Sequence, residues 1–435
     1  MEKKKSTAGH NAYQLASRIF PIHRCLMGEK VKETLEILSS HMSKESDLNM
    51  TVHSIPTGTQ VFDWIIPREW VLREAYIENE AGERIIDVKE NNLFVVGYST
   101  AVDRWVERDE LLKYICIQED QPDVIPYVTS YYKERYGFCM EKNRRDHLPD
   151  GRYHMVIDSE LIEGYLTYGE VVIPGKKSQE ILFSTYICHP SMANDNCSGM
   201  ALQTELINYV ESIQNRKYTY RFLFVPETIG SIAYISQHLD YMKQHIVAGF
   251  NLSCVGDNKY YSLVHTREAD SLVDRVMSHL FDFTEGKCVE YSFAERGSDE
   301  RQYNSPRVAL PVVNFSRSIF HDFPEYHTSA DNMTFISEEG LQGSYDMMRR
   351  AITLLEHNER YVTKVFCEPQ LGKRGLYPTL SHKNNQMGKS PIVQLLGYAD
   401  GKRDLIDIAN AVGMAADELI ESLEILKEAN LIEEA

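Results

Sequence analysis

Apolar runs and helical patterns alternate through the central part of the chain, from residue 126 to residue 355. Residues 181–188 form a near-continuous apolar run, which is typical of a strand buried on both faces. Residues 200–210 follow with apolar positions at helical spacing. Further strands are expected at 221–225, 249–255 and 309–315, and further helices at 232–245 and 341–355. This alternation predicts an α/β fold with a mostly parallel sheet flanked by helices.

The two ends of the chain have different patterns. Residues 16–42 have apolar positions at helical spacing, interrupted by Pro21, and short alternating runs between residues 61 and 116 predict a small β-rich unit. Residues 372–389 are rich in Gly, Asn, Lys and Ser, which predicts a linker. Three short helices are expected beyond it, at 392–396, 405–412 and 417–429, and their arrangement is typical of a winged-helix module.

The chain has 435 residues, a length that predicts two or three domains. We expect a discontinuous catalytic domain of residues 1–60 and 120–370. An inserted β-rich domain would occupy residues 61–119, and a winged-helix-like domain would occupy residues 390–435.

The composition indicates a cytoplasmic protein. The net charge of −18 argues against nucleic acid as the main partner, because phosphate would be repelled. No stretch approaches the roughly 20 apolar residues that span a bilayer, so no membrane partner is expected. The N-terminus has no apolar run of the secretory type. The eight cysteines are scattered without a Cys-x-x-Cys pair, as buried free thiols in a reducing cytosol would be.

Several polar residues follow the predicted strands, where ligands collect in α/β sheets. His189 and Asp195 lie between the strand at 181–188 and the next helix, and Glu227 follows the strand at 221–225. His327 belongs to a third polar segment. Each has a purely structural alternative, since Asp195 can cap a helix and Glu227 can begin one. Together they suggest a metal site.

Two neighbours of His327 suggest supporting roles. Tyr326 can donate its phenol to a developing oxyanion, and Asp331 can orient a histidine ligand through a hydrogen bond. A fourth segment is crowded with charge and carries Glu295, Arg296, Asp299 and Glu300. It is either a solvated loop or a loop that binds the charged ends of a substrate, and the sequence leaves both readings open.

In this order, the motifs resemble the zinc aminopeptidase superfamily, which also contains the glutaminyl cyclases. The match consists of His189, Asp195-Asn196-x-x-Gly199, Glu227 with the following Gly230-Ser231, and Tyr326-His327-x-x-x-Asp331. The segments 20–25, 61–64 and 67–70 are similar to a bacterial branch of aminopeptidase-like proteins associated with polysaccharide biosynthesis. That branch has a small inserted domain and a C-terminal winged helix.

The chain departs from the family pattern at two positions. Ser253 stands where the family has a carboxylate ligand, and Glu227 stands alone where the family has two glutamates. The resemblance therefore implies one zinc ion rather than two, held by His189, Asp195 and His327, with Glu227 as general base. Two alternatives stay open. Asp195, Glu227 and His327 can be the ligands, as in the glutaminyl cyclases, or Asp257 can supply the missing carboxylate.

The expected function is hydrolysis of an amide or peptide bond near a free amino group, in a small peptide or amide substrate. Asp299, Glu300 or Glu295 would recognise the amine. The alternatives are an acyl-transfer or amino-sugar amide enzyme on the same site, and a binding or scaffold protein whose site has decayed. Residues 402–435 carry three basic residues against nine acidic ones, so we expect the C-terminal module to contact protein rather than DNA. A homo-oligomer through the inserted or C-terminal domain is one such arrangement.

Overall fold

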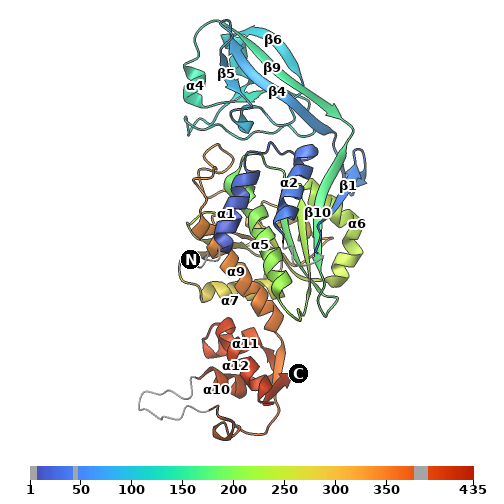
Figure 1. Cartoon of the computed structure of the whole chain (residues 1–435), viewed down its shortest axis with the longest axis vertical. Helices are drawn as coiled ribbons and strands as arrows, with labels where there is room; N and C mark the ends of the chain where they lie inside the picture. Colours follow the sequence, from blue (N-terminus) through green and yellow to red (C-terminus); the bar gives the residue numbers. More distant parts are fainter. Residues whose placement is uncertain (1–6, 43–47, 377–389) are drawn as a thin grey trace, which may run out of the picture. The chain divides into compact units, whose positions relative to one another are not determined.

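An eight-stranded sheet is the main feature of the computed structural model, which describes residues 7–42, 48–376 and 390–435 (Figure 1). In spatial order its strands are β1 (Thr51–Pro56), β10 (Tyr165–Ile173), β12 (Thr219–Val225), β11 (Glu180–Tyr186), β13 (Ile246–Leu252), β16 (Val312–Ser316), β14 (Tyr261–Val264) and β15 (Cys288–Tyr291). The central strands β12, β11, β13 and β16 are parallel, whereas β1, β10 and β14 pair antiparallel with their neighbours. The predicted α/β fold is confirmed.

The apolar run at the centre of the sheet is buried as its sequence predicts. All seven residues of β11 are buried. Phe183 stacks on Phe222 of β12 and on Phe250 of β13, with ring centroids 5.2 and 4.9 Å apart. A strand covered by helices on both faces needs apolar side chains on both, which explains the absence of alternation.

Two crossover helices lie on opposite faces of the sheet. Helix α5 (Gly199–Ser212) connects β11 to β12, and helix α6 (Ile229–His245) connects β12 to β13 on the other side of β11. Because such crossovers are right-handed, connections that run in opposite directions place their helices on opposite faces. A crevice therefore opens between the carboxyl ends of β11 and β12, the usual position of a binding site in such sheets.

Two helices near the N-terminus pack beside α5 on one face of the large sheet. Both α1 (Ala8–Ile19) and α2 (Glu29–His41) contact α5, and the three helices lie side by side in Figure 1. Short helices α3 (Arg108–Leu111), α4 (Lys142–Asp146) and α8 (Glu300–Tyr303) occur in connections, and α9 (Glu338–His357) follows the last parallel strand. No helix in the described ranges is both long and apolar enough to cross a bilayer.

A separate four-stranded antiparallel sheet forms the β-rich part of the chain, with the order β5-β4-β9-β6. Its strands are β4 (Glu69–Asn79), β5 (Arg84–Asp87), β6 (Val102–Glu107) and β9 (Arg152–Ile162), accompanied by the hairpin β2 (Gln60–Val61) and β3 (Trp64–Ile65) and by the pair β7 (Ile115–Cys116) and β8 (Phe138–Cys139). Strand β9 lies beyond residue 119, the expected end of the insert. The domain limits themselves stay a prediction.

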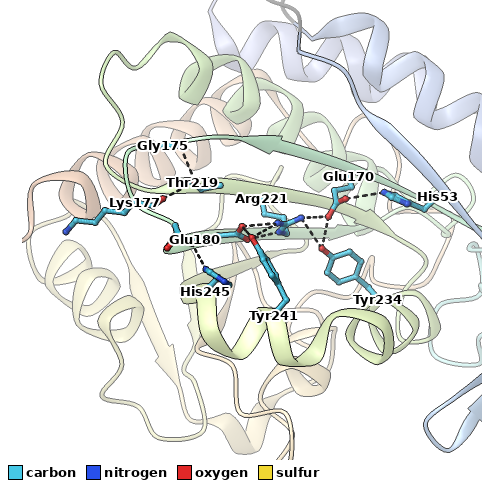
Figure 2. Close-up of polar contacts among 11 residues, drawn as sticks. His53, Glu170, Gly175, Lys177, Glu180, Thr219, Arg221, Tyr234, Tyr241 and His245 are labelled. Carbon is cyan, nitrogen blue, oxygen red and sulfur yellow. Dashed lines mark hydrogen bonds and ion pairs between the residues drawn. The ribbon is translucent and has the colours of Figure 1, made fainter.

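A charged network connects strands at one side of the large sheet (Figure 2). Arg221 of β12 donates two hydrogen bonds to Glu180 of β11, at 2.7 and 2.9 Å, and another to Glu170 of β10. Tyr234 of α6 donates to Glu170 at 2.6 Å, and Tyr241 of the same helix donates to Glu180. Both ends of the Arg221 fork are thus paired, which allows the charge to be buried.

The chain divides into two compact units, and the second consists of residues 270–288 and 346–435. It contains α7 (Leu272–Asp282), the end of α9, β17 (Arg360–Thr363), α10 (Pro391–Tyr398), β18 (Asp400–Asp404), α11 (Leu405–Val412), α12 (Ala416–Glu428) and β19 (Ile432–Glu434). Within it the backbone N–H of Ala416 donates to His279, and Arg275 pairs with Asp404 and Asp407. The three predicted C-terminal helices are present. Of the predicted linker, residues 377–389 lie outside the described residues.

Candidate metal centre

The crevice at the carboxyl ends of the parallel strands collects four of the predicted site residues. His189 and Asp195 follow β11, Glu227 follows β12, and His327 lies between β16 and α9. Asp195 is part of an irregular turn, η3 (Ala193–Ser198), which contains the cis peptide bond before Asn196 and leads directly into α5. Three segments distant in sequence therefore meet at one edge of the sheet.

His189, Asp195 and His327 each offer one potential ligand atom, and the three atoms lie within 4.8 Å of one another. Nε2 of His327 is 3.1 Å from Oδ2 of Asp195. Among the described residues, these two buried atoms approach each other, and neither has a further hydrogen-bond partner. Buried polar atoms are normally satisfied, so this unpartnered pair fits a bound cation. Imidazole nitrogen and carboxylate oxygen are both zinc ligands.

The protonation states of the group also fit a cation. Burial lowers the pKa of His189 to about 4, so its ring is neutral at neutral pH. Burial alone would raise the pKa of Asp195, but the rings of His189 and His327 outweigh this and lower it to about 2. A metal ion requires deprotonated ligands, and both residues already have that form.

Asp195 is held in place by hydrogen bonds on two sides. The hydroxyl of Tyr186, at the end of β11, donates to its Oδ1. Asp331 accepts hydrogen bonds from the backbone N–H groups of Asn194 and Asp195, at 2.6 and 2.9 Å. Asp331 therefore fixes the turn that carries Asp195, whereas the sequence predicted that it would orient a histidine.

Glu227 lies beside the three-residue group without belonging to it. Its Oε2 is 3.8 Å from Nε2 of His189, and its backbone N–H donates to the sulfur of Cys188 at 3.3 Å. Burial and the nearby carboxylate of Asp299 raise the pKa of Glu227 well above its usual value. A carboxyl group with a raised pKa next to a metal site is suited to accept a proton and return it. This position favours a role as base over the rival role as ligand.

Ser253, which replaces a carboxylate of the family pattern, and Asp257, which could supply that carboxylate, both make other contacts. Ser253 is buried after β13 and donates a hydrogen bond to Asn314 at 2.9 Å. Asp257 accepts from the backbone and hydroxyl of Ser318, at 3.0 and 2.9 Å, and from Asn194 at 3.1 Å. Neither residue belongs to the group formed by His189, Asp195 and His327 in the described part of the chain.

A pocket of about 360 Å³ opens next to the group. Its walls are aromatic and apolar with a few polar side chains, and they consist of Leu26, Trp64, Tyr127, Thr129, Tyr131, Tyr132, Cys188, His189, Glu227, Thr228, Ile229, Arg301 and His327. The Tyr127 ring lies 5.2 and 5.1 Å from the rings of His189 and His327, measured between centroids. Tyr326 stacks on His327 at 3.9 Å. The pocket is small enough to suit one small molecule.

The four charged residues of the loop at 295–300 lie outside the lining of this pocket. Glu295 and Arg296 are exposed, whereas Asp299 and Glu300 are fully buried. Asp299 accepts hydrogen bonds from the backbone N–H of Thr228 and the hydroxyl of Ser231, both at 2.7 Å, and so fixes the segment that carries Glu227. Tyr186, Tyr127 and Arg301 were not singled out from the sequence. Tyr186 lies within the predicted strand at 181–188, and Arg301 lies within the charged segment that begins at Glu295.

Fold and site together define an aminopeptidase-like α/β protein with a C-terminal winged helix. Residues 13–358 match the family described as "Domain of unknown function (DUF4910)", and the chain belongs to this family. Residues 359–434 match a winged helix-turn-helix family. The second match confirms the winged helix inferred from the sequence, and solved structures of a provisionally named peptidase and of a zinc aminopeptidase confirm the fold that the resemblance implied.

Known proteins extend this comparison. A protein of Clostridium acetobutylicum, named provisionally as a polysaccharide biosynthesis protein with an aminopeptidase-like domain, is 41% identical over 414 residues, covering 95% of this chain and 93% of its own. A crystal structure of a provisionally named peptidase from the same organism has a TM-score of 0.91 at 39% identity, covering 98% and 96% of the two chains.

A zinc aminopeptidase of Bacillus subtilis, BSAP, has a TM-score of 0.59 at 15% identity, covering 81% of this chain and 96% of its own. At that identity the likeness shows the fold alone.

Proposed function

We propose that this protein is a zinc-dependent hydrolase of an amide or peptide bond, with a single ion bound by His189, Asp195 and His327. The unpartnered buried atoms of Asp195 and His327 carry the proposal, together with the convergence of His189 on the same space. Three protein ligands leave a fourth zinc position open, as catalytic zinc sites do. The absence of further carboxylates from this group supports one ion rather than two in the described part of the chain.

The chain's own residues divide the remaining work. A zinc ion in this site would supply Lewis-acid polarisation of a carbonyl group. The Glu227 carboxylate takes a proton from the attacking water molecule and returns it to the leaving amine. Tyr326 packs on His327, and in this proposal its phenol donates a hydrogen bond to the developing oxyanion. The aromatic lining of the pocket excludes water from the bond that is cleaved.

A second candidate is an enzyme that acts on an amide of an amino sugar at the same site. Trp64, Tyr127 and Tyr131 line the pocket, and flat aromatic surfaces suit sugar rings as well as aromatic side chains. The name of the Clostridium relative, which refers to polysaccharide biosynthesis, also favours this substrate class. Parallel assays with aminoacyl amides and with N-acyl amino sugars on the zinc-loaded protein distinguish the two.

The proposed base can be tested by Glu227→Gln. The amide keeps the shape of the side chain but cannot take up a proton, so hydrolysis should fall by about 10²–10⁴-fold while the zinc content stays the same. Turnover and bound metal are measured on the same samples. Glu119→Gln, at an exposed position, is the matched control and should retain full activity. Unchanged hydrolysis in Glu227→Gln would refute this mechanism.

A further inference from the structure

Arg301 is a cation that lines the pocket and has no salt-bridge partner among the residues that the structure describes. It lies on α8 and lines the pocket together with Glu227 and His327. Its Nη2 donates to the hydroxyl of Thr228 at 2.8 Å, and its Nε is buried without a hydrogen-bond partner. In the ranges that the structure describes, the guanidinium forms no ion pair within 4.0 Å, although burial raises the pKa of Glu227 and of Asp299 and the charge of Arg301 counteracts that rise.

The acidic residues next to Arg301 in sequence are already bonded to other donors. Oδ1 of Asp299 accepts from the backbone of Thr228 and from Ser231, whereas its Oδ2 is buried without a hydrogen-bond partner among the described residues. Glu300 accepts from the backbone N–H groups of Gly297 and Ser298, at 2.8 and 3.2 Å. A guanidinium normally binds an anion through two of its five donors. Arg301 therefore has donors available for an anion that enters from the pocket.

The charges of the pocket indicate which kind of anion would fit. Apart from the two histidines, its charged lining consists of one guanidinium, Arg301, and one carboxyl group, Glu227. A carboxylate carries one negative charge, which a single guanidinium can balance. A phosphate carries close to two charges at neutral pH, and the nearby Glu227 would repel it more strongly. The observations thus favour a carboxylate.

The aromatic residues of the same pocket favour a ligand that also carries a flat apolar group. Trp64 belongs to the hairpin β2–β3, and its ring contacts Tyr132 with centroids 5.9 Å apart. The two side chains are 40% and 58% exposed, so both can pack against a ligand. Tyr127 and Tyr131 continue this surface toward the metal-ligand group, with their hydroxyls 3.3 Å apart.

We infer that the pocket recognises a small amide that carries a free carboxylate and a planar ring, with the carboxylate bound by Arg301 and the ring packed on Trp64, Tyr127 and Tyr132. The inference rests on the proposed function, because it names the substrate class of the same site. Selection by a carboxylate makes the acid end of the substrate, rather than only its amine, a determinant of specificity.

The test compares two ligands that differ in one group, N-acetyl-L-tyrosine and N-acetyl-L-tyrosinamide. Isothermal titration calorimetry on the full-length, zinc-loaded protein should show at least about tenfold tighter binding of the acid, as one charge-assisted contact provides. In Arg301→Gln this preference should disappear, while binding of the neutral amide stays within about twofold. Arg301→Lys should retain part of the preference, and Arg307→Gln, an exposed arginine, should retain all of it.

A control separates Arg301 from the metal, since a carboxylate can also bind zinc. In His327→Ala protein stripped of metal, the preference for the acid should persist if Arg301 is its source. Loss of the preference in that protein would overturn the inference, as would equal binding of both ligands by the wild type. Displacement of the acid by inorganic phosphate at lower concentration than by acetate would also overturn it. None of these readings depends on turnover, so failure of the proposed hydrolysis would be seen separately.

Discussion

Asp195 is the most constrained side chain of the site. The Tyr186 hydroxyl and the His327 ring approach its two carboxylate oxygens, and Asp331 holds its backbone N–H. A carboxylate fixed in this way presents Oδ2 to the space shared with the histidines without further rearrangement. Contacts that orient a ligand are a large part of metal affinity.

Tyr186→Phe should therefore weaken zinc binding by about 10–100-fold, because it removes one hydrogen bond that orients Asp195 and leaves the ring in place. Competition with a chromophoric zinc chelator measures the change. Tyr361→Phe is the matched control, since the Tyr361 hydroxyl bonds the carbonyl of His357 in the other unit. Equal zinc affinity in Tyr186→Phe and wild type would show that this contact has no part in the site.

Individual site residues differed in how far the sequence could predict them. His189, Asp195 and His327 follow strands or match a motif, so residue type and position were enough to single them out, and the structure places them together. Arg301 and Tyr127 carry no motif. They reach the pocket because α8 and the segment that carries Tyr127 pack beside residues distant in sequence, and contacts between distant segments leave no periodic signal.

The secondary-structure elements also divide into those that the sequence predicted and those that it did not. Strands β11, β12 and β13 and helices α5 and α6 were predicted within a few residues, because buried parallel strands and crossover helices have strong apolar patterns. Strands β9 and β10 were missed. Both are long and pair antiparallel with a strand on each side. Their patterns mix polar and apolar residues, because the strands on which they pack decide which face is buried.

The charged network around Arg221 is expected to support the sheet. Its side chain is only 10% exposed and bonds both Glu170 and Glu180, so Arg221→Met would leave Glu180 without a cation and Glu170 with His53 alone. The free energy of unfolding of the sheet should fall by about 3–5 kcal/mol, as read from the urea midpoint. Arg73→Met removes exposed pairs with Asp158 and Glu160 and should shift the urea midpoint far less, because water screens exposed ion pairs.

The same network makes the free energy of unfolding decrease as the pH falls into the acid range. Burial would raise the pKa of Glu170, but Tyr234 and Arg221 lower it below its usual value. Its contribution is complete above the pKa of the unfolded chain, about 4.3, and is lost as the pH falls through the folded value. Arg221→Met should flatten this acid limb. A loss of stability equal to that of Arg73→Met would contradict the role given to the network.

The whole chain shares its architecture with the Clostridium structure, which it matches over 98% of its length with a TM-score of 0.91. The winged helix thus accompanies the aminopeptidase-like domain in both proteins. The second helix of its helix-turn-helix, α12, carries five acidic residues and one lysine. That charge disfavours the contacts with phosphate on which DNA binding depends. Association through this domain or the β-rich one stays a prediction.

We expect no binding to duplex DNA at low salt, as measured by fluorescence anisotropy with the full-length protein. The exposed Glu421 and Glu428 provide a control, because replacing both with lysine leaves three acidic residues and three lysines on α12, and removing its net negative charge should permit weak, salt-sensitive binding. Salt-sensitive binding by the wild type would assign the domain a nucleic-acid partner and would refute this expectation.

The zinc content of the purified protein tests the central claim most directly. Wild-type protein dialysed against trace zinc should retain one ion per chain in inductively coupled plasma mass spectrometry, as three converging ligands predict. His327→Ala should lose that ion, whereas His147→Ala, at an exposed position, should keep it. A wild-type protein without bound zinc, or one whose zinc content is the same in His327→Ala, would contradict a metal centre at His189, Asp195 and His327 and would favour a binding protein with a decayed site.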